Sequence, residues 1–122
     1  MDVEKYPKKL SLHKYNWSDE HNEEINEWCQ QHICKEIYWA CQFATGDLPK
    51  HIDRPTNIKF VYLLDTGGDQ VYTKFWSEDG NTLLSQYLVP LHQWCIIKVN
   101  SLHSLEGMAD NSVRFAVTGK IF

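Results

Sequence analysis

The chain has 122 residues, which is enough for one domain with a single hydrophobic core. Hydrophobic residues make up 43% of it and aromatic residues 13%, a composition that favours a globular protein with an aromatic-rich interior. Its formal net charge of −4 gives no attraction to nucleic acid or to an anionic membrane, and no apolar run approaches the roughly 20 residues that span a bilayer. We therefore expect a single domain over residues 1–122, with neither nucleic acid nor membrane as a partner.

The N-terminal part is predicted to be an arm followed by a helix. Residues 1–16 are polar and mixed, and because they begin without the apolar core of a signal peptide, we expect an extended arm of a cytoplasmic protein. Ser18 or Asp19 can cap a helix over residues 18–33. Apolar side chains recur at helical spacing and form one stripe, Ile25, Trp28, Cys29 and Ile33. We expect this stripe to be buried against a sheet, since an exposed patch of that kind would be an association site.

From residue 34 onward the sequence changes to short β-prone runs separated by turn signals. Aromatic and β-branched residues dominate the predicted strands, which cover 36–45, 58–64, 70–76, 82–89, 94–99 and 113–122. The glycine-containing turn between the second and third runs predicts that these two pair as a hairpin. One helix followed by many short strands predicts a mainly β fold, a double-sheet barrel or jelly roll over residues 34–122.

The first chemical signal lies in the segment 48–53, after a turn. His51 and Asp53 are two residues apart, and on an extended strand such residues point to the same face. His103, which follows a later apolar run, is available as a third ligand. Two histidines and one carboxylate around a metal, with the other positions open, suit a non-haem Fe(II) oxygenase. His13, His21 and His92 are not expected to be ligands, because none of them is paired with a carboxylate on a predicted strand.

The order His51-x-Asp53, His103, Arg114 resembles the Fe(II)/2-oxoglutarate-dependent dioxygenases, in particular their prolyl-hydroxylase-like branch and small viral and bacterial members. The resemblance covers residues 33–122. It implies a double-stranded β-helix, a cupin-like jelly roll, with the N-terminal helix packed on the sheet. It also implies Fe(II) bound by the two histidines and the aspartate, and 2-oxoglutarate held at its far carboxylate by Arg114, whose guanidinium suits a two-point grip.

The activity implied by this resemblance is hydroxylation of a peptidyl side chain or of a small molecule, with release of succinate and CO2. Some relatives carry a serine two residues after the arginine, where this chain has Ala116. A second contact to 2-oxoglutarate must therefore come from elsewhere, and the candidates are Tyr62, Tyr72 and Lys74. Trp76 and Tyr87 are predicted to frame the substrate, because functional residues concentrate on loops over a rigid scaffold.

Other interpretations stay open at the level of sequence. A jelly-roll domain that binds a metal or small carboxylate without catalysis would have the same pattern, and so would an interaction domain in which the triad is accidental. A zinc site competes for the cysteines, using Cys29, His32 and Cys34 or else His92 and Cys95, although neither group has the paired spacing of structural zinc sites. The chain has little helical support behind the sheet, which a homo-oligomer formed through the N-terminal arm and helix would supply.

Overall fold

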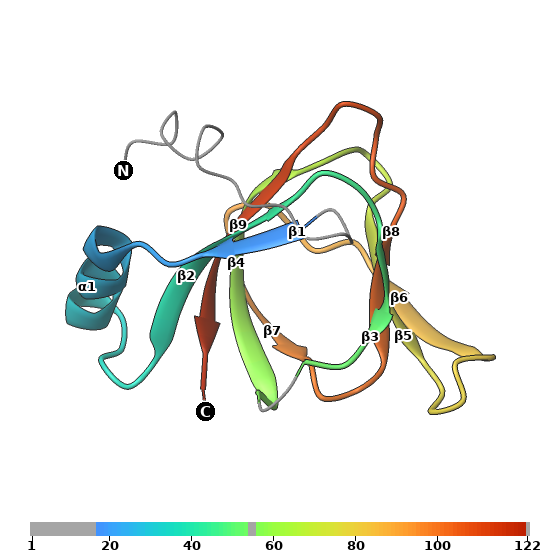
Figure 1. The fold of residues 1–122 in the computed structure, drawn as a ribbon, viewed down its shortest axis with the longest axis horizontal. Coiled ribbons are helices and arrows are strands. Elements are labelled where there is room, and N and C mark those ends of the chain that lie inside the picture. Colours follow the sequence, from blue (N-terminus) through green and yellow to red (C-terminus); the bar gives the residue numbers. More distant parts are fainter. Residues whose placement is uncertain (1–16, 54–55, 122) are drawn as a thin grey trace.

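The computed structural model describes residues 17–53 and 56–121. In chain order, its elements are β1 (Trp17–Glu20), α1 (Glu23–His32), β2 (Tyr38–Ala44), β3 (Leu48–His51), β4 (Ile58–Thr66), β5 (Tyr72–Trp76), β6 (Leu83–Tyr87), β7 (Trp94–Lys98), β8 (His103–Glu106) and β9 (Arg114–Lys120). The strands form two antiparallel sheets in the orders β1-β2-β9-β4-β7 and β3-β8-β5-β6. The two sheets face each other across the interior of the roll (Figure 1). This confirms the predicted mainly β jelly roll.

The main apolar core lies outside the roll, between α1 and the outer face of the larger sheet (Figure 1). Alternate residues of β2 point outward, and Trp39, Cys41 and Phe43 are all buried beneath the helix residues Ile25 and Cys29. Partly buried aromatic and aliphatic side chains of β4 and β9 extend this layer. The expected packing of the helix on the sheet is therefore confirmed.

Between the two sheets the apolar clusters are smaller. One cluster consists of Val61, Leu63 and Ala116, all from the larger sheet, and another of Ala44, Val71 and Leu105. Polar residues are buried among these clusters, on the inner faces of both sheets. The interior of the roll therefore offers buried polar groups inside an apolar wall, which is a suitable setting for a binding site.

The helix is shorter than predicted. Residues 17–20 form β1, paired with β2, so the prediction that Ser18 or Asp19 caps the helix is wrong. The cap is Asn22, whose side chain accepts the Ile25 N–H at 2.9 Å. With ten residues, α1 is neither long nor apolar enough to cross a membrane, and the described residues contain no helix that is. The predicted arm over residues 1–16 lies outside the described residues.

The predicted stripe of α1 is only half buried. Ile25 and Cys29 face the sheet, but Trp28 is 56% exposed and Ile33, just beyond the helix, is also exposed. Among the strands, α1 packs mainly against β2, so the surface that the sheet offers to the helix is only about one strand wide. Ile25 and Cys29, which lie one helical turn apart on the same face, are enough to cover it. Trp28 instead stacks on His32, with ring centroids 4.3 Å apart. The prediction that Trp28 is a core residue is therefore wrong.

The predicted pairing of the second and third runs is also wrong. β4 lies between β9 and β7 in the larger sheet, whereas β5 lies between β8 and β6 in the smaller one. The turn between them passes from one sheet to the other through Gly67 and Gly68, whose φ angles of 78° and 149° favour glycine. An added Cβ at Gly67 would also lie 2.6 Å from Met108. The turn residues thus serve a crossing between sheets and not a hairpin.

Candidate metal centre

His51, Asp53 and His103 meet at one end of the neighbouring strands β3 and β8 of the smaller sheet. β3 and β8 pair with His51 opposite His103, and the centroids of the two rings are 4.3 Å apart. Asp53 lies just after β3, where its N–H donates to the Val99 carbonyl at 2.9 Å. Its Oδ1 atom is 3.3 Å from Nε2 of His51 and 3.6 Å from Nε2 of His103. One ligand atom from each residue lies within 4.8 Å of the others.

Both imidazole rings are held in the orientation that a metal ligand needs. Nδ1 of His51 lies 2.7 Å from the Pro49 carbonyl oxygen, and Nδ1 of His103 lies 2.7 Å from the Ser101 carbonyl oxygen. A carbonyl oxygen only accepts hydrogen bonds, so each Nδ1 must carry a proton. Each neutral ring then presents the lone pair of Nε2 to the shared centre. A backbone partner of this kind is the usual support for a metal-binding histidine.

The electrostatics favour a charged carboxylate at this point. Burial by itself would raise the pKa of the Asp53 carboxyl, but the hydrogen bond from His51 and the positive charge of Lys59 outweigh it and lower that pKa to about 2. The same hydrogen bond raises the pKa of His51, whereas burial lowers the pKa of His103. The carboxylate of Asp53 is therefore ionised at neutral pH and lies beside the two histidines.

This donor set fits a divalent transition-metal ion such as Fe(II), which binds imidazole and carboxylate ligands and leaves positions open when only three are supplied. Within the described ranges 17–53 and 56–121, no other group of three or more histidine, cysteine or acidic side chains comes together in this way. The alternative zinc cluster of Cys29, His32 and Cys34 does not form, and Cys29 is buried as a thiol outside any disulfide.

Lys59 belongs to the site, although it was not among the predicted residues. It lies on the inner face of β4, is only 6% exposed, and places Nζ 3.8 Å from Oδ2 of Asp53. The sequence does contain a signal for it. Lys59 is in strand phase with Val61 and Leu63, which are both buried, so alternation alone points its side chain into the interior.

Arg114, at the start of β9, lines the same cavity as His51 and His103. This cavity, between the two sheets, is also lined by apolar side chains, among them Val61, Ile97, Val99 and Leu105. One nitrogen of the guanidinium (Nη1) donates to the Thr66 carbonyl at 3.1 Å. Burial lowers the pKa of Arg114 to about 10, which leaves it charged at neutral pH. In the part of the chain that the structure describes, no carboxylate lies within ion-pair distance of it.

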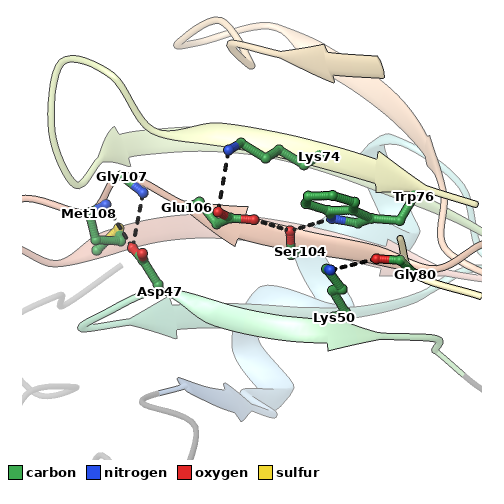
Figure 2. A network of polar contacts seen from close by, with 9 residues as sticks. All are labelled: Asp47, Lys50, Lys74, Trp76, Gly80, Ser104, Glu106, Gly107 and Met108. Atoms are coloured by element: carbon green, nitrogen blue, oxygen red, sulfur yellow. Dashed lines mark hydrogen bonds and ion pairs between the residues drawn. The ribbon is translucent and has the colours of Figure 1, made fainter. Parts of the chain in front are cut away.

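Two of the weaker candidates lie on the other side of the smaller sheet. Strand alternation points Thr73 of β5 into the cavity and Lys74 and Trp76 away from it. Figure 2 shows these two joined in a separate network: Lys74 pairs with Glu106 at 3.3 Å, and the Trp76 indole donates to Ser104 at 2.9 Å. The structure thus does not bring Lys74 or Trp76 together with the triad.

The three tyrosines also lie apart from Arg114. Tyr62 points outward from β4 and contacts Trp94, with ring centroids 5.1 Å apart, and the Tyr72 hydroxyl donates to Gln70 at 2.8 Å. Tyr87 is exposed at the edge strand β6 and contacts Phe75, which in turn lies beside His103 with ring centroids 6.1 Å apart. The polar side chains that do share the cavity with Arg114 and the histidines are Gln42, Lys59 and Thr73.

No protein-family model and no curated protein matches this chain. Its fold resembles that of several solved structures. Protein NMB1881 from Neisseria meningitidis is 9% identical with a TM-score of 0.55, over 100% of this chain and 98% of that one. The fold is a cupin-like jelly roll.

Two enzyme structures have a similar fold. Oxalate oxidase in complex with the substrate analogue glycolate is 12% identical with a TM-score of 0.54, over 88% of this chain and 52% of that one. HppE with Co(II) and Tris buffer is 7% identical with a TM-score of 0.52, over 93% and 58%. The chain spans only 43% of the length of Fe(II)-HppE in a further structure. At these identities the similarity establishes the fold and leaves the activity to be argued from the site.

Proposed function

We propose that this protein is an Fe(II)- and 2-oxoglutarate-dependent oxygenase that hydroxylates a peptidyl side chain or a small molecule. The observation that carries the proposal is the content of one cavity. The two histidines of the triad line it, with Asp53 beside them, together with Arg114, a partly buried guanidinium that has no acidic partner among the described residues. A single ligand that binds the metal at one end and the Arg114 guanidinium at the other would account for the presence of both groups.

The charges in the cavity support an anionic ligand. A divalent ion bound by Asp53 leaves one positive charge, to which Lys59 and Arg114 add two more. 2-Oxoglutarate carries two carboxylates and fits this excess. Arg114 would grip the carboxylate remote from the metal, because a guanidinium binds a carboxylate through two parallel hydrogen bonds. The apolar lining would strengthen this pair by lowering the local dielectric constant.

The histidines and Asp53 would hold and orient the ion, with each Nε2 directed by the backbone bond at Nδ1. When bound, Fe(II) would supply the reaction with O2 that protein side chains lack. The overall reaction converts a C–H group, O2 and 2-oxoglutarate into a C–OH group, succinate and CO2. One oxygen atom enters the substrate and the other enters succinate, so the oxidation of the two organic reactants accounts for all four electrons that O2 takes up.

The test is an anaerobic titration of the protein with Fe(II) and then with 2-oxoglutarate, monitored in the visible region, followed by exposure to air. The proposal predicts a metal-to-ligand charge-transfer band and then release of succinate. An Asp53→Ala variant is the matched control and should give no band. A wild-type protein that gives no band contradicts the proposal. A band without succinate under any substrate supply would favour the alternative function, a domain that binds a metal and a small carboxylate without catalysis.

A further inference from the structure

We propose that Lys59 is a positioning residue that keeps Asp53 bound to the metal through one oxygen only, and so preserves an open coordination position for the co-substrate. This inference rests on the proposed function, since it assigns Lys59 a role at the same site. Lys59 is not part of the pattern His51-x-Asp53, His103, Arg114 on which the proposed function is based.

The two oxygens of the Asp53 carboxylate face different partners. Oδ1 is directed to the ligand nitrogens, 3.3 Å from Nε2 of His51 and 3.6 Å from Nε2 of His103. Oδ2 is directed to Lys59, with Nζ 3.8 Å away. The two oxygens of the Asp53 carboxylate thus have different roles: Oδ1 faces the metal site, and Oδ2 forms an ion pair with the ammonium group of Lys59.

The position of the ammonium group is fixed by the fold. Lys59 lies in β4, which has a neighbouring strand on each side, with Ile97 of β7 opposite on one side and Lys120 of β9 opposite on the other. Its side chain is 7% exposed. Moving a buried charge away from its counter-ion is costly, so the Lys59–Asp53 pair should persist when a metal is bound.

The consequence concerns the number of open positions. An octahedral ion with three single-atom protein ligands keeps three positions free, which suffice for the two donor atoms of a 2-oxo acid and for O2. A carboxylate that chelated through both oxygens would occupy one of these three. By retaining Oδ2, Lys59 would prevent this chelation without itself touching the metal.

The experiment compares four variants with Co(II) as the probe ion. Lys59→Met removes the charge and keeps the length of the side chain, and Lys59→Gln is a second neutral variant of different polarity. Lys59→Arg restores the charge. Lys74→Met is the matched control, because Lys74 has its own ion pair with Glu106 on the far face of the smaller sheet (Figure 2). Thermal melts establish that each variant is folded.

The decisive readout is infrared difference spectroscopy of the Co(II)-bound against the metal-free protein, with carboxyl-labelled aspartate. The separation between the antisymmetric and symmetric carboxylate stretches is larger for one-oxygen than for two-oxygen binding. We expect the large separation in wild type, Lys59→Arg and Lys74→Met, and the small one in Lys59→Met and Lys59→Gln. The dissociation constant of 2-oxoglutarate should rise about tenfold in the neutral variants, the lower end of what supporting residues contribute at metal sites.

An unchanged separation in both neutral variants would overturn the inference, even if 2-oxoglutarate binding weakened, because Lys59 would then act on the co-substrate directly. Wild-type protein that binds Co(II) but not 2-oxoglutarate would overturn the proposed function alone, and the stretch separation would still decide the role of Lys59. A wild-type protein that binds no divalent ion would overturn both.

Discussion

The two faces of the larger sheet are built from the same strands and have opposite characters. In β4, Lys59 points into the roll and Phe60 points out, and in β9 the same holds for Arg114 and Phe115. The outer face packs against α1 and neighbouring aromatic side chains; Phe115, for example, stacks on Phe43 with ring centroids 4.7 Å apart. The inner face carries the charged groups of the cavity.

The contrast between the apolar outer face and the charged inner face shows how a small domain can hold buried charges. Burying an ammonium or guanidinium group costs stability even when it is paired. Here a large part of the apolar burial is on the outer face, away from these charges, where Trp39 is 1% exposed and Cys41 is fully buried. We therefore expect substitutions on the outer face to change stability and substitutions on the inner face to change binding.

The largest effect is expected at Asp53, on the inner side. Asp53→Asn should abolish Fe(II) binding, because the site loses its only anionic ligand among the three, while the similar size of asparagine leaves the fold intact. Anaerobic calorimetry with Fe(II) and a thermal melt check the two parts. An iron affinity equal to that of wild type would show that Asp53 is not a metal ligand, and would contradict the assignment of binding to the inner face.

Next in size is the outer face. Trp39→Ala should lower the free energy of unfolding by about 3–5 kcal/mol, the usual cost of truncating a buried aromatic residue. The folded fraction should bind iron as wild type does. Trp28→Ala is the matched control: at 56% exposure it should cost within about 0.5 kcal/mol. Chemical denaturation measures both, and equal losses in the two variants would show that the core is not where we place it.

Arg114 should show a smaller effect, confined to the co-substrate. Removing hydrogen bonds to a charged group costs about 1.5–3 kcal/mol, so Arg114→Ala should raise the 2-oxoglutarate concentration for half-saturation by roughly 10- to 150-fold. Fe(II) affinity should stay close to that of wild type, because the guanidinium is not a metal ligand. Titration of the visible band measures the first quantity. Unchanged 2-oxoglutarate affinity would show that Arg114 has another role.

The smallest effect is on the pH dependence of metal binding. The hydrogen bond with Asp53 raises the pKa of His51, and the metal must displace that proton from Nε2. Metal affinity should therefore fall as pH drops below the raised pKa, by about tenfold per pH unit, and level off above it. Because burial lowers the pKa of His103, protons compete with the metal for this histidine only at a lower pH than for His51. Calorimetry with Co(II) from pH 6 to pH 8 would measure this, and a flat profile would argue against His51 as a ligand.

Local patterns predicted much of the site and less of the topology. The spacing of His51 and Asp53 predicted that their side chains share one face, and the structure brings them together although β3 ends at His51. Their meeting with His103 was expected from the resemblance, since β3 and β8 are far apart in sequence. The pairing of β4 with β5 was wrong because a turn sequence does not reveal whether the chain stays in one sheet or crosses to another.

Two single residues show the same limit at smaller scale. Trp28 follows the same helical repeat as the buried residues Ile25 and Cys29. The repeat does not tell how wide a surface the sheet offers to the helix, and here α1 contacts mainly one strand, β2, which leaves Trp28 exposed. Lys59 was missed although its strand phase marks it as inward, because a lysine in a strand is ordinarily assumed to be exposed. A charged residue in phase with buried neighbours is thus a signal worth using.

The most direct test of the account is X-ray absorption at the iron edge of the anaerobic Fe(II)-loaded protein. The account predicts a shell of nitrogen and oxygen ligands at about 2.0–2.3 Å, the range for imidazole and carboxylate ligands of similar ions, with the outer scattering of two imidazole rings. His103→Ala should reduce that scattering to one ring. A spectrum of bound iron without imidazole scattering, or one that His103→Ala leaves unchanged, would contradict the account.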